Sequence, residues 1–232
     1  MIAEVEPAAS GTPVFDRPDD WPGWPLYARS RRCDADDGSS DMAGRLPAAL
    51  ANAVRPRRIQ YVAGRLCAVR ALDDAGCIDP GWIDMGPDRL PCWPQGWTGS
   101  ISHSDHRATA VVAPTSACRA VGIDIERIGR CGDAPPTGSV GTPAEWSLLA
   151  AAPSALAFTL LFSAKEALYK ALYPLCRRFQ DFDAARLTAM HGPSLQLRLT
   201  RSWGEGFPSG AAFAVSTLCR DGHVHACVRI DA

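Results

Sequence analysis

Apolar residues recur every three or four positions between residues 57 and 72, at Ile59, Val62, Leu66, Val69 and Leu72. This period is typical of the buried face of an α-helix. Arg58, Arg65 and Arg70 lie off the apolar stripe. The segment is therefore predicted to be an amphipathic helix with a basic face, and packing of its apolar stripe against a core is the ordinary role of such a helix.

Residues 120–126 instead show a twofold alternation. Two sets of residues alternate there: Val121, Ile123 and Ile125 in one, and Gly122, Asp124 and Glu126 in the other. Successive side chains of a β-strand point to opposite faces, so the first set can enter a core while both acids share the other face. A strand is also predicted at residues 108–113, one short turn earlier, so the acidic strand is expected to lie inside a sheet.

The rest of the chain divides into irregular and regular segments. Residues 1–44, 73–98 and 129–141 are rich in Pro, Gly or Ser and are predicted to be irregular. Helices are predicted at 143–151 and from Ser163 onward, and strands at 194–200, 211–218 and 223–230. Helices segregated from antiparallel strands favour the α+β class.

The composition and charge of the chain argue against some classes of function. The chain has 232 residues, 47% of them hydrophobic, and a formal net charge of −1. No global field favours nucleic acid or a membrane surface, and no apolar run is long enough to span a bilayer. The acidic N-terminus lacks the features of a secretory signal, and the nine cysteines are scattered singly. These features favour a cytoplasmic protein with reduced thiols.

The acids Asp124, Glu126 and Glu166 are the best candidates for chemistry. They are hard oxygen donors of the kind that Mg²⁺ prefers, and Lys165 and Lys170 flank the third acid. Gly122 lies on the acidic face and would let a ligand approach closely. Two structural alternatives stay open: a solvated strand face, and a capping box in which Ser163 and Glu166 begin a helix.

Two further clusters contain possible ligands. Ser102 and His103 are suited to hydrogen-bonding phosphate, whereas the adjacent residues 104–106 are typical of a polar turn. His223, His225 and Cys227 share one face of a predicted strand and form a conceivable transition-metal set. The apolar residues alternating with them favour a half-buried edge strand instead.

Three separated blocks together resemble one enzyme family. They are Gly99-Ser100-Ile101-Ser102-His103-Ser104, Val121-Gly122-Ile123-Asp124-Ile125-Glu126 and Phe162-Ser163-Ala164-Lys165-Glu166-Ala167-Leu168-Tyr169-Lys170. Their order and separation resemble the 4′-phosphopantetheinyl transferase superfamily. The arginine helix and Pro91-Cys92-Trp93-Pro94 are similar to its enterobactin synthetase component D branch. The resemblance covers residues 55–190 approximately.

The resemblance implies a fold and an activity. It implies a pseudo-twofold pair of similar α+β halves, near residues 1–115 and 116–232, with the active site in the cleft between them. It also implies transfer of phosphopantetheine from coenzyme A to a serine of an apo acyl- or peptidyl-carrier protein, releasing adenosine 3′,5′-bisphosphate. A monomer is expected, and the loop at 129–141 is expected near the carrier-protein contact.

The resemblance also implies residue roles. Asp124, Glu126 and Glu166 would hold Mg²⁺, with Mn²⁺ as an alternative, and Glu166 would deprotonate the carrier serine directly or through water. Lys165 would contact phosphate, and Lys170 would stabilise or protonate the departing phosphate oxygen.

Other implied roles concern coenzyme A. Arg57 and Arg65 would bind the 3′-phosphate together with His103, Ser102 would donate to the phosphate chain, and Arg89 is a weaker candidate. A hydrolase of the coenzyme A pyrophosphate and a non-catalytic module binding coenzyme A or carrier protein are the alternatives.

Overall fold

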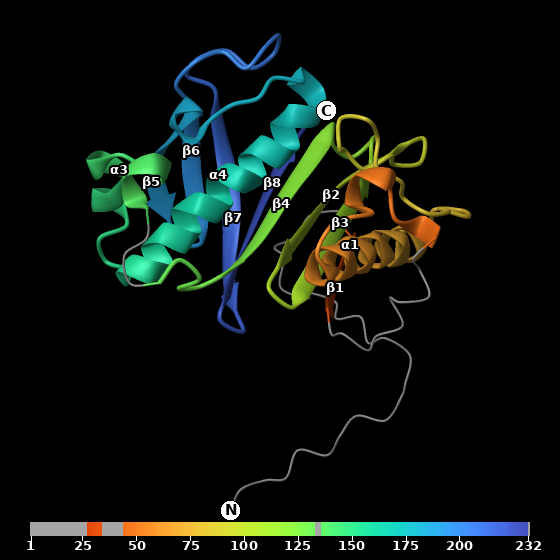
Figure 1. The fold of residues 1–232 in the computed structure, drawn as a ribbon. Helices are drawn as coiled ribbons and strands as arrows, with labels where there is room; N and C mark the ends of the chain where they lie inside the picture. The colour runs from red at the N-terminus through yellow and green to blue at the C-terminus, as the bar shows by residue number, and fades with distance from the viewer. Residues whose placement is uncertain (1–26, 34–43, 133–135, 232) are drawn as a thin grey trace, which may run out of the picture.

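The protein is described here by a computed structural model, in which residues 27–33, 44–132 and 136–231 are placed. Two antiparallel sheets lie side by side, and one long helix packs on each (Figure 1). The predicted α+β class is confirmed. A pairing of one helix with one sheet in each half is compatible with similar halves, although the sheets contain three and five strands. The boundary between residues 115 and 116 stays a prediction.

The N-terminal sheet has three strands in the order β1-β3-β2. They are β1 (Tyr27–Arg32), β2 (Trp97–Ser104) and β3 (Arg107–Pro114). The predicted basic helix is α1 (Arg55–Asp74), which follows the short helix η2 (Ala48–Leu50). Its small and apolar residues, among them Ala63, Cys67 and Leu72, pack on Ala108, Ala110 and Val112 of β3. The remaining arginine-rich surface of α1 is left for the cleft described below.

The C-terminal sheet has five strands in the order β4-β8-β7-β6-β5. They are β4 (Ala120–Arg127), β5 (Ala185–His191), β6 (Ser194–Leu199), β7 (Ala212–Arg220) and β8 (His223–Ile230). The helical residues are α2 (Thr137–Val140), α3 (Pro143–Leu148), α4 (Ser154–Cys176) and η3 (Phe182–Ala184). Apolar residues of α4 pack on β4, β7 and β8 to form the larger core.

Three serine side chains join the two sheets. The hydroxyls of Ser100, Ser102 and Ser104 on β2 accept hydrogen bonds from the backbone N–H groups of Ile123, Ile125 and Arg127 on β4, at 3.1, 3.3 and 3.1 Å. We call this set of bonds the serine ladder. It places β2 along the free edge of β4 without main-chain pairing, and so it brings the phosphate-binding candidates beside the acidic strand.

Several predicted elements differ from the observed ones. Residues 99–104 form a strand where a polar turn was expected for part of the segment, and β1 lies within the stretch predicted to be irregular. The remainder of residues 1–44 lies largely outside the described residues. The helix expected from Ser163 begins at Ser154, after Pro153, and β5 was not predicted. Within the placed segments no helix is both long and apolar enough to cross a bilayer.

Gly122 explains how close α4 comes to β4. A methyl group added to it would lie 2.0 Å from the Ala167 carbonyl oxygen and 2.5 Å from the Ala171 backbone nitrogen. The glycine therefore admits the helix backbone, and the expectation that it admits a ligand is wrong. The acidic face of β4 is consequently turned toward the helix that carries Glu166 and Lys170.

Candidate functional site

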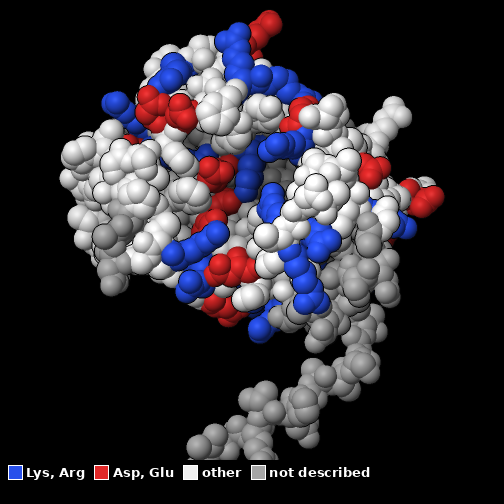
Figure 2. All heavy atoms as spheres, in the orientation of Figure 1, with Lys and Arg blue, Asp and Glu red and all other residues white. Residues whose placement is uncertain are grey.

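A basic cleft runs between the two halves, with a volume of about 540 Å³. Its walls come from α1, the segment 85–93, β2, the start of β4 and the second half of α4. Among the placed residues its lining contains no Asp or Glu, and its basic members are Arg57, Arg65, Arg89, His103, Lys170 and Arg177. Basic and acidic side chains both gather along the hollow between the halves (Figure 2). Such a lining suits a polyanion.

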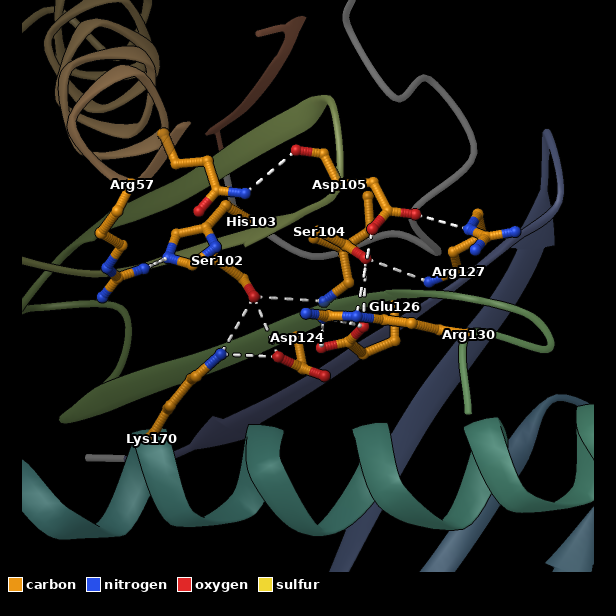
Figure 3. A network of polar contacts seen from close by, with 12 residues as sticks. Arg57, Ser102, His103, Ser104, Asp105, Asp124, Glu126, Arg127, Arg130 and Lys170 are labelled. Carbon is orange, nitrogen blue, oxygen red and sulfur yellow. Dashed lines mark hydrogen bonds and ion pairs between the residues drawn. The ribbon is translucent and has the colours of Figure 1, made fainter. Parts of the chain in front are cut away.

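Arg57 and His103 meet on the wall of the cleft that belongs to the N-terminal half. A guanidinium N–H of Arg57, in the first turn of α1, points at His103 Nε2 on β2 (Figure 3). Burial and the charges of Arg57 and Lys170 lower the pKa of His103 to about 4. The imidazole is therefore neutral at pH 7, so its Nε2 accepts from Arg57. Arg57 also lines the cleft.

Arg65 lies two turns further along α1 and is 6% exposed. Its guanidinium sits over the Tyr61 ring, 4.5 Å from the ring centre, and its Nε has no hydrogen-bond partner among the placed residues. Burial lowers its pKa. Arg89 comes from a tight turn in which its φ is 65° and its N–H donates to the Gly86 carbonyl. The N-terminal half thus contributes three arginines to the cleft, two from α1 and one from this turn.

Asp124 is the most buried of the three predicted metal ligands, at 4% exposure. Its Oδ1 accepts from Ser102 Oγ at 2.9 Å and from Lys170 Nζ at 2.6 Å (Figure 3). Its Oδ2 is buried and has no hydrogen-bond partner among the placed residues. A buried carboxylate oxygen without a donor is costly unless a ligand satisfies it.

Glu126 lies one strand repeat further on and is held by two donors. Ser104 Oγ donates to Oε2 at 3.0 Å, and Arg130 Nη1 lies 3.1 Å from the same oxygen. Ser104 was expected in a turn, but it is the third residue of the serine ladder. Arg130 was not predicted as a site residue, and its spacing of four residues from Glu126 on a non-helical segment gave no signal.

Glu166 reaches the same region from α4. Burial raises the pKa of its carboxyl group, Lys170 opposes this, and the negative charges of Asp124 and Glu126 add to it. Glu166 therefore feels the negative charge of both strand acids. Glu166 also lines a hollow of about 270 Å³ with aromatic walls from Tyr169, Phe179, Phe182 and Trp203.

The acidic residues fit a hard divalent cation by chemistry. All three are oxygen donors, one oxygen lacks a partner, and repulsion between them would be relieved by a positive charge. In the placed segments no group of three His, Cys, Asp or Glu side chains is arranged so that it could hold a metal ion. Lys170 and Arg130 instead provide the positive charge beside Asp124 and Glu126.

The two lysines of α4 have different surroundings. Lys170 lies in the cleft and also donates to Ser102 Oγ at 3.0 Å. Lys165 is 4% exposed and its Nζ is 2.7 Å from Oε1 of Glu145. It is therefore not in the lining of the basic cleft, and its predicted contact with phosphate gains no support from the geometry.

The structure excludes the alternative of a capping box at Ser163 and Glu166. Ser163 is fully buried inside α4, nine residues after the helix begins. The chain does contain a capping box, but it joins Thr142 and Glu145 at the start of α3. The Thr-Pro-Ala-Glu spacing there was a signal that the sequence offered. Glu166 is thus free of a capping role.

Arg177 is a cleft residue that the sequence reasoning left as a solvated helix end. It follows α4 in a left-handed conformation and forms an ion pair with Asp88 of the N-terminal half. Its place in the lining depends on how the halves meet. No local pattern in the sequence could have revealed it.

Two family models match the chain in succession. The model of the 4′-phosphopantetheinyl transferase N-terminal domain matches residues 46–113, and that of the 4′-phosphopantetheinyl transferase superfamily matches residues 120–228. The chain belongs to the 4′-phosphopantetheinyl transferase superfamily. The resemblance stated from the three sequence blocks is thereby confirmed, and the junction between the matches falls between β3 and β4.

Curated relatives carry related names. The 4′-phosphopantetheinyl transferase PptT of Mycobacterium tuberculosis is 39% identical over 60% of this chain and 61% of its own length. Enterobactin synthase component D of Salmonella typhi is 38% identical over 65% of this chain and 62% of its own length. The 4′-phosphopantetheinyl transferase Svp of Streptomyces mobaraensis is 35% identical over 72% and 68%. The chain thus spans about three fifths of the length of the first two relatives.

Proposed function

We propose that this protein transfers the 4′-phosphopantetheine group of coenzyme A to a serine of an apo carrier protein and releases adenosine 3′,5′-bisphosphate. The observation that carries the proposal is the basic cleft, free of carboxylates among its placed lining residues, in which Lys170 joins the lining to Asp124 of the acidic strand. A ligand with several phosphates is suited to the cleft, and a phosphoryl transfer needs a metal-binding group at one end of it.

Coenzyme A would be held by the residues of the N-terminal half. Arg57 and Arg65 present planar guanidinium groups, which suit a terminal phosphate, and the neutral His103 keeps Arg57 in place. Arg89 adds positive charge from the facing turn. The Ser102 hydroxyl donates its one hydrogen to Asp124 and accepts from Lys170, so it would orient both groups, and it would have to leave Asp124 to donate to the phosphate chain.

Asp124, Glu126 and Glu166 would hold Mg²⁺, with Mn²⁺ as the alternative ion. When bound, such an ion polarises the phosphate oxygens and neutralises charge that grows on them. The unpartnered Oδ2 of Asp124 and the mutual repulsion of the acids support this assignment. The ammonium group of Lys170, which is paired with Asp124, would move to the departing phosphate oxygen. Its positive charge would offset the negative charge that develops there.

Glu166 would take the proton of the carrier serine. A serine hydroxyl is a weak nucleophile at neutral pH without a base, and a carboxyl group with a raised pKa is better matched to that task. Glu166 also lies at the edge of the aromatic hollow, so it is accessible from a side of α4 other than that facing Asp124. The protein is proposed to act in the cytoplasm as a monomer.

The deciding experiment incubates the protein with coenzyme A, Mg²⁺ and several apo carrier proteins, and reads the carrier by intact mass. Addition of a phosphopantetheine mass supports the transferase. Cleavage of coenzyme A with unmodified carriers would instead support a hydrolase, and binding without either product a non-catalytic module. Omission of Mg²⁺ and addition of a chelator in parallel tests the metal.

The variant Glu166→Gln tests the site itself. It should abolish transfer, since it removes both a metal ligand and the base. Because Glu166 caps no helix and is repelled by its neighbours, the variant should be at least as stable as the wild type. Glu205→Gln, in an exposed turn, is the matched control. Full turnover by Glu166→Gln would refute the assignment.

A further inference from the structure

Lys165 is engaged on all sides by the protein itself. Its ammonium group lies 2.7 Å from Oε1 of Glu145 and donates to the carbonyl oxygens of Val140 at 2.8 Å and Phe182 at 3.0 Å. An ammonium group has three N–H donors, so these partners use all of them. The side chain is 3% exposed. No donor of Lys165 is left for a ligand.

Both carboxylate oxygens of Glu145 also have hydrogen-bond donors. Its Oε1 also accepts from the backbone N–H of Leu187 at 2.9 Å, and its Oε2 accepts from the N–H and the hydroxyl of Thr142 at 2.8 and 2.9 Å. Burial alone would raise the pKa of this carboxyl group, but the hydrogen bonds from Lys165, Leu187 and Thr142 lower it. Burial lowers the pKa of Lys165, and the hydrogen bond to Glu145 opposes that shift. Both groups have their hydrogen-bonding capacity filled, which is the condition under which a buried ion pair persists.

These bonds converge on one turn of α4. They connect it to the end of α2 at Val140, to the capping box of α3, to η3 at Phe182 and to β5 at Leu187. The next residue along α4 is Glu166, which lines the aromatic hollow together with Lys165 and Phe182. The place of Glu166 is thus tied through Lys165 to four segments that touch no part of the basic cleft.

We propose that Lys165 and Glu145 are a positioning pair that fixes Glu166 in the metal site, and that Lys165 makes no contact with coenzyme A. The proposal rests on the function proposed above and assigns Glu145 a role in it. A phosphate contact by Lys165 would break three bonds and leave the carboxylate of Glu145 buried beside no cation. Removal of one partner of a buried pair is strongly destabilising, so a single phosphate contact does not offset it.

The test compares Lys165→Met, Glu145→Gln and the double variant with Lys170→Met. Isothermal calorimetry without metal measures coenzyme A affinity, and the transfer assay gives kcat and the Mg²⁺ concentration for half-maximal rate. Assays run at 10 °C, where thermal unfolding confirms that each variant is folded. Lys170→Met is the positive control for a lysine that lines the cleft.

We expect the Lys165 and Glu145 variants to bind coenzyme A within about twofold of the wild type. Their half-maximal Mg²⁺ concentration should rise, and kcat should fall by about tenfold or more, because Glu166 loses its support. Lys170→Met should weaken coenzyme A binding. The double variant should be more stable than Lys165→Met alone, since no unpaired charge is left buried. If Lys165→Met does not fold, Glu145→Gln and the double variant carry the same comparison.

Two results would overturn the proposal. Tenfold weaker coenzyme A binding in Lys165→Met, with normal binding in Glu145→Gln, would make Lys165 a phosphate ligand. Lower stability with unchanged kcat and Mg²⁺ dependence would make the pair structural only. A wild-type protein that binds no coenzyme A would refute the proposed function with it, whereas normal wild-type transfer with either result above refutes the positioning role alone.

Discussion

Substitution of Gly122 by alanine should disable the proposed transfer, although Gly122 is outside the lining of the basic cleft. The new methyl group would lie 2.0 Å from the Ala167 carbonyl, whereas ordinary contact begins at 3.4 Å. The obstacle is helix backbone, which cannot rotate away as a flexible side chain does. Helix α4 must therefore retreat from β4 by more than about 1 Å to accept it.

That retreat has a cost in stability and in geometry. Overpacking a well-packed contact typically costs up to about 3 kcal/mol, and for a chain of this size such a loss lowers the melting temperature by roughly 6–12 °C. The same movement stretches the 2.6 Å contact between Lys170 and Asp124 beyond hydrogen-bonding distance. Transfer activity should consequently fall even at temperatures where the variant remains folded.

Urea unfolding and the carrier mass assay measure the two effects separately. Gly138→Ala is the matched control, because a methyl group there meets no atom within 4 Å and its backbone φ is not in the left-handed region. The control should retain both stability and activity. If Gly122→Ala unfolds at the wild-type urea concentration and turns over normally, the tight packing of α4 on β4 is not what aligns the site.

Three further predictions concern single polar groups. The pKa of His103 is lowered to about 4, so its neutral form contributes stability that is present above pH 6.5 and lost as the pH falls toward 4; His103→Gln should flatten this dependence in urea unfolding between pH 7 and 4.5. Ser102→Ala removes the hydroxyl that bonds to the N–H of Ile125 and to one oxygen of Asp124. The variant should lower the free energy of unfolding, measured in urea, by about 1–3 kcal/mol. Asp88→Asn removes an exposed ion pair with Arg177 and should change the unfolding free energy by less than about 1 kcal/mol, a larger loss indicating that this pair holds the halves together.

The elements predicted from the sequence are those whose burial follows a regular period. The helix α1 and the strand β4 were both located within a few residues. The core face of α1 is nevertheless made mainly of small residues such as Ala63, Cys67 and Ala68, and only Val62 and Leu72 of the predicted stripe are buried. The acids of β4 followed from its twofold alternation, because a strand must place Asp124 and Glu126 on one side. Their approach to Glu166 came from the resemblance to a family, since it depends on contacts between distant elements.

The strands and the ion pair that were missed are held by contacts that leave no apolar pattern in the sequence. Strand β2 alternates serines, whose buried partners are backbone N–H groups of another strand, so its hydroxyls resembled a turn. Strand β1 buries Ser30 and Arg31 and therefore lacks an apolar pattern. The partner of Lys165 lies twenty residues earlier in the chain, and only the packing of α3 against β5 brings Glu145 to it.

Single substitutions can change the junction between the halves, because the serine ladder is made of side-chain hydrogen bonds. Main-chain pairing in a sheet is indifferent to side-chain identity, whereas each rung here is a single hydroxyl that one codon change can delete while keeping the residue small. The contact between the halves can thus be weakened one hydrogen bond at a time, while neither sheet has to be rebuilt.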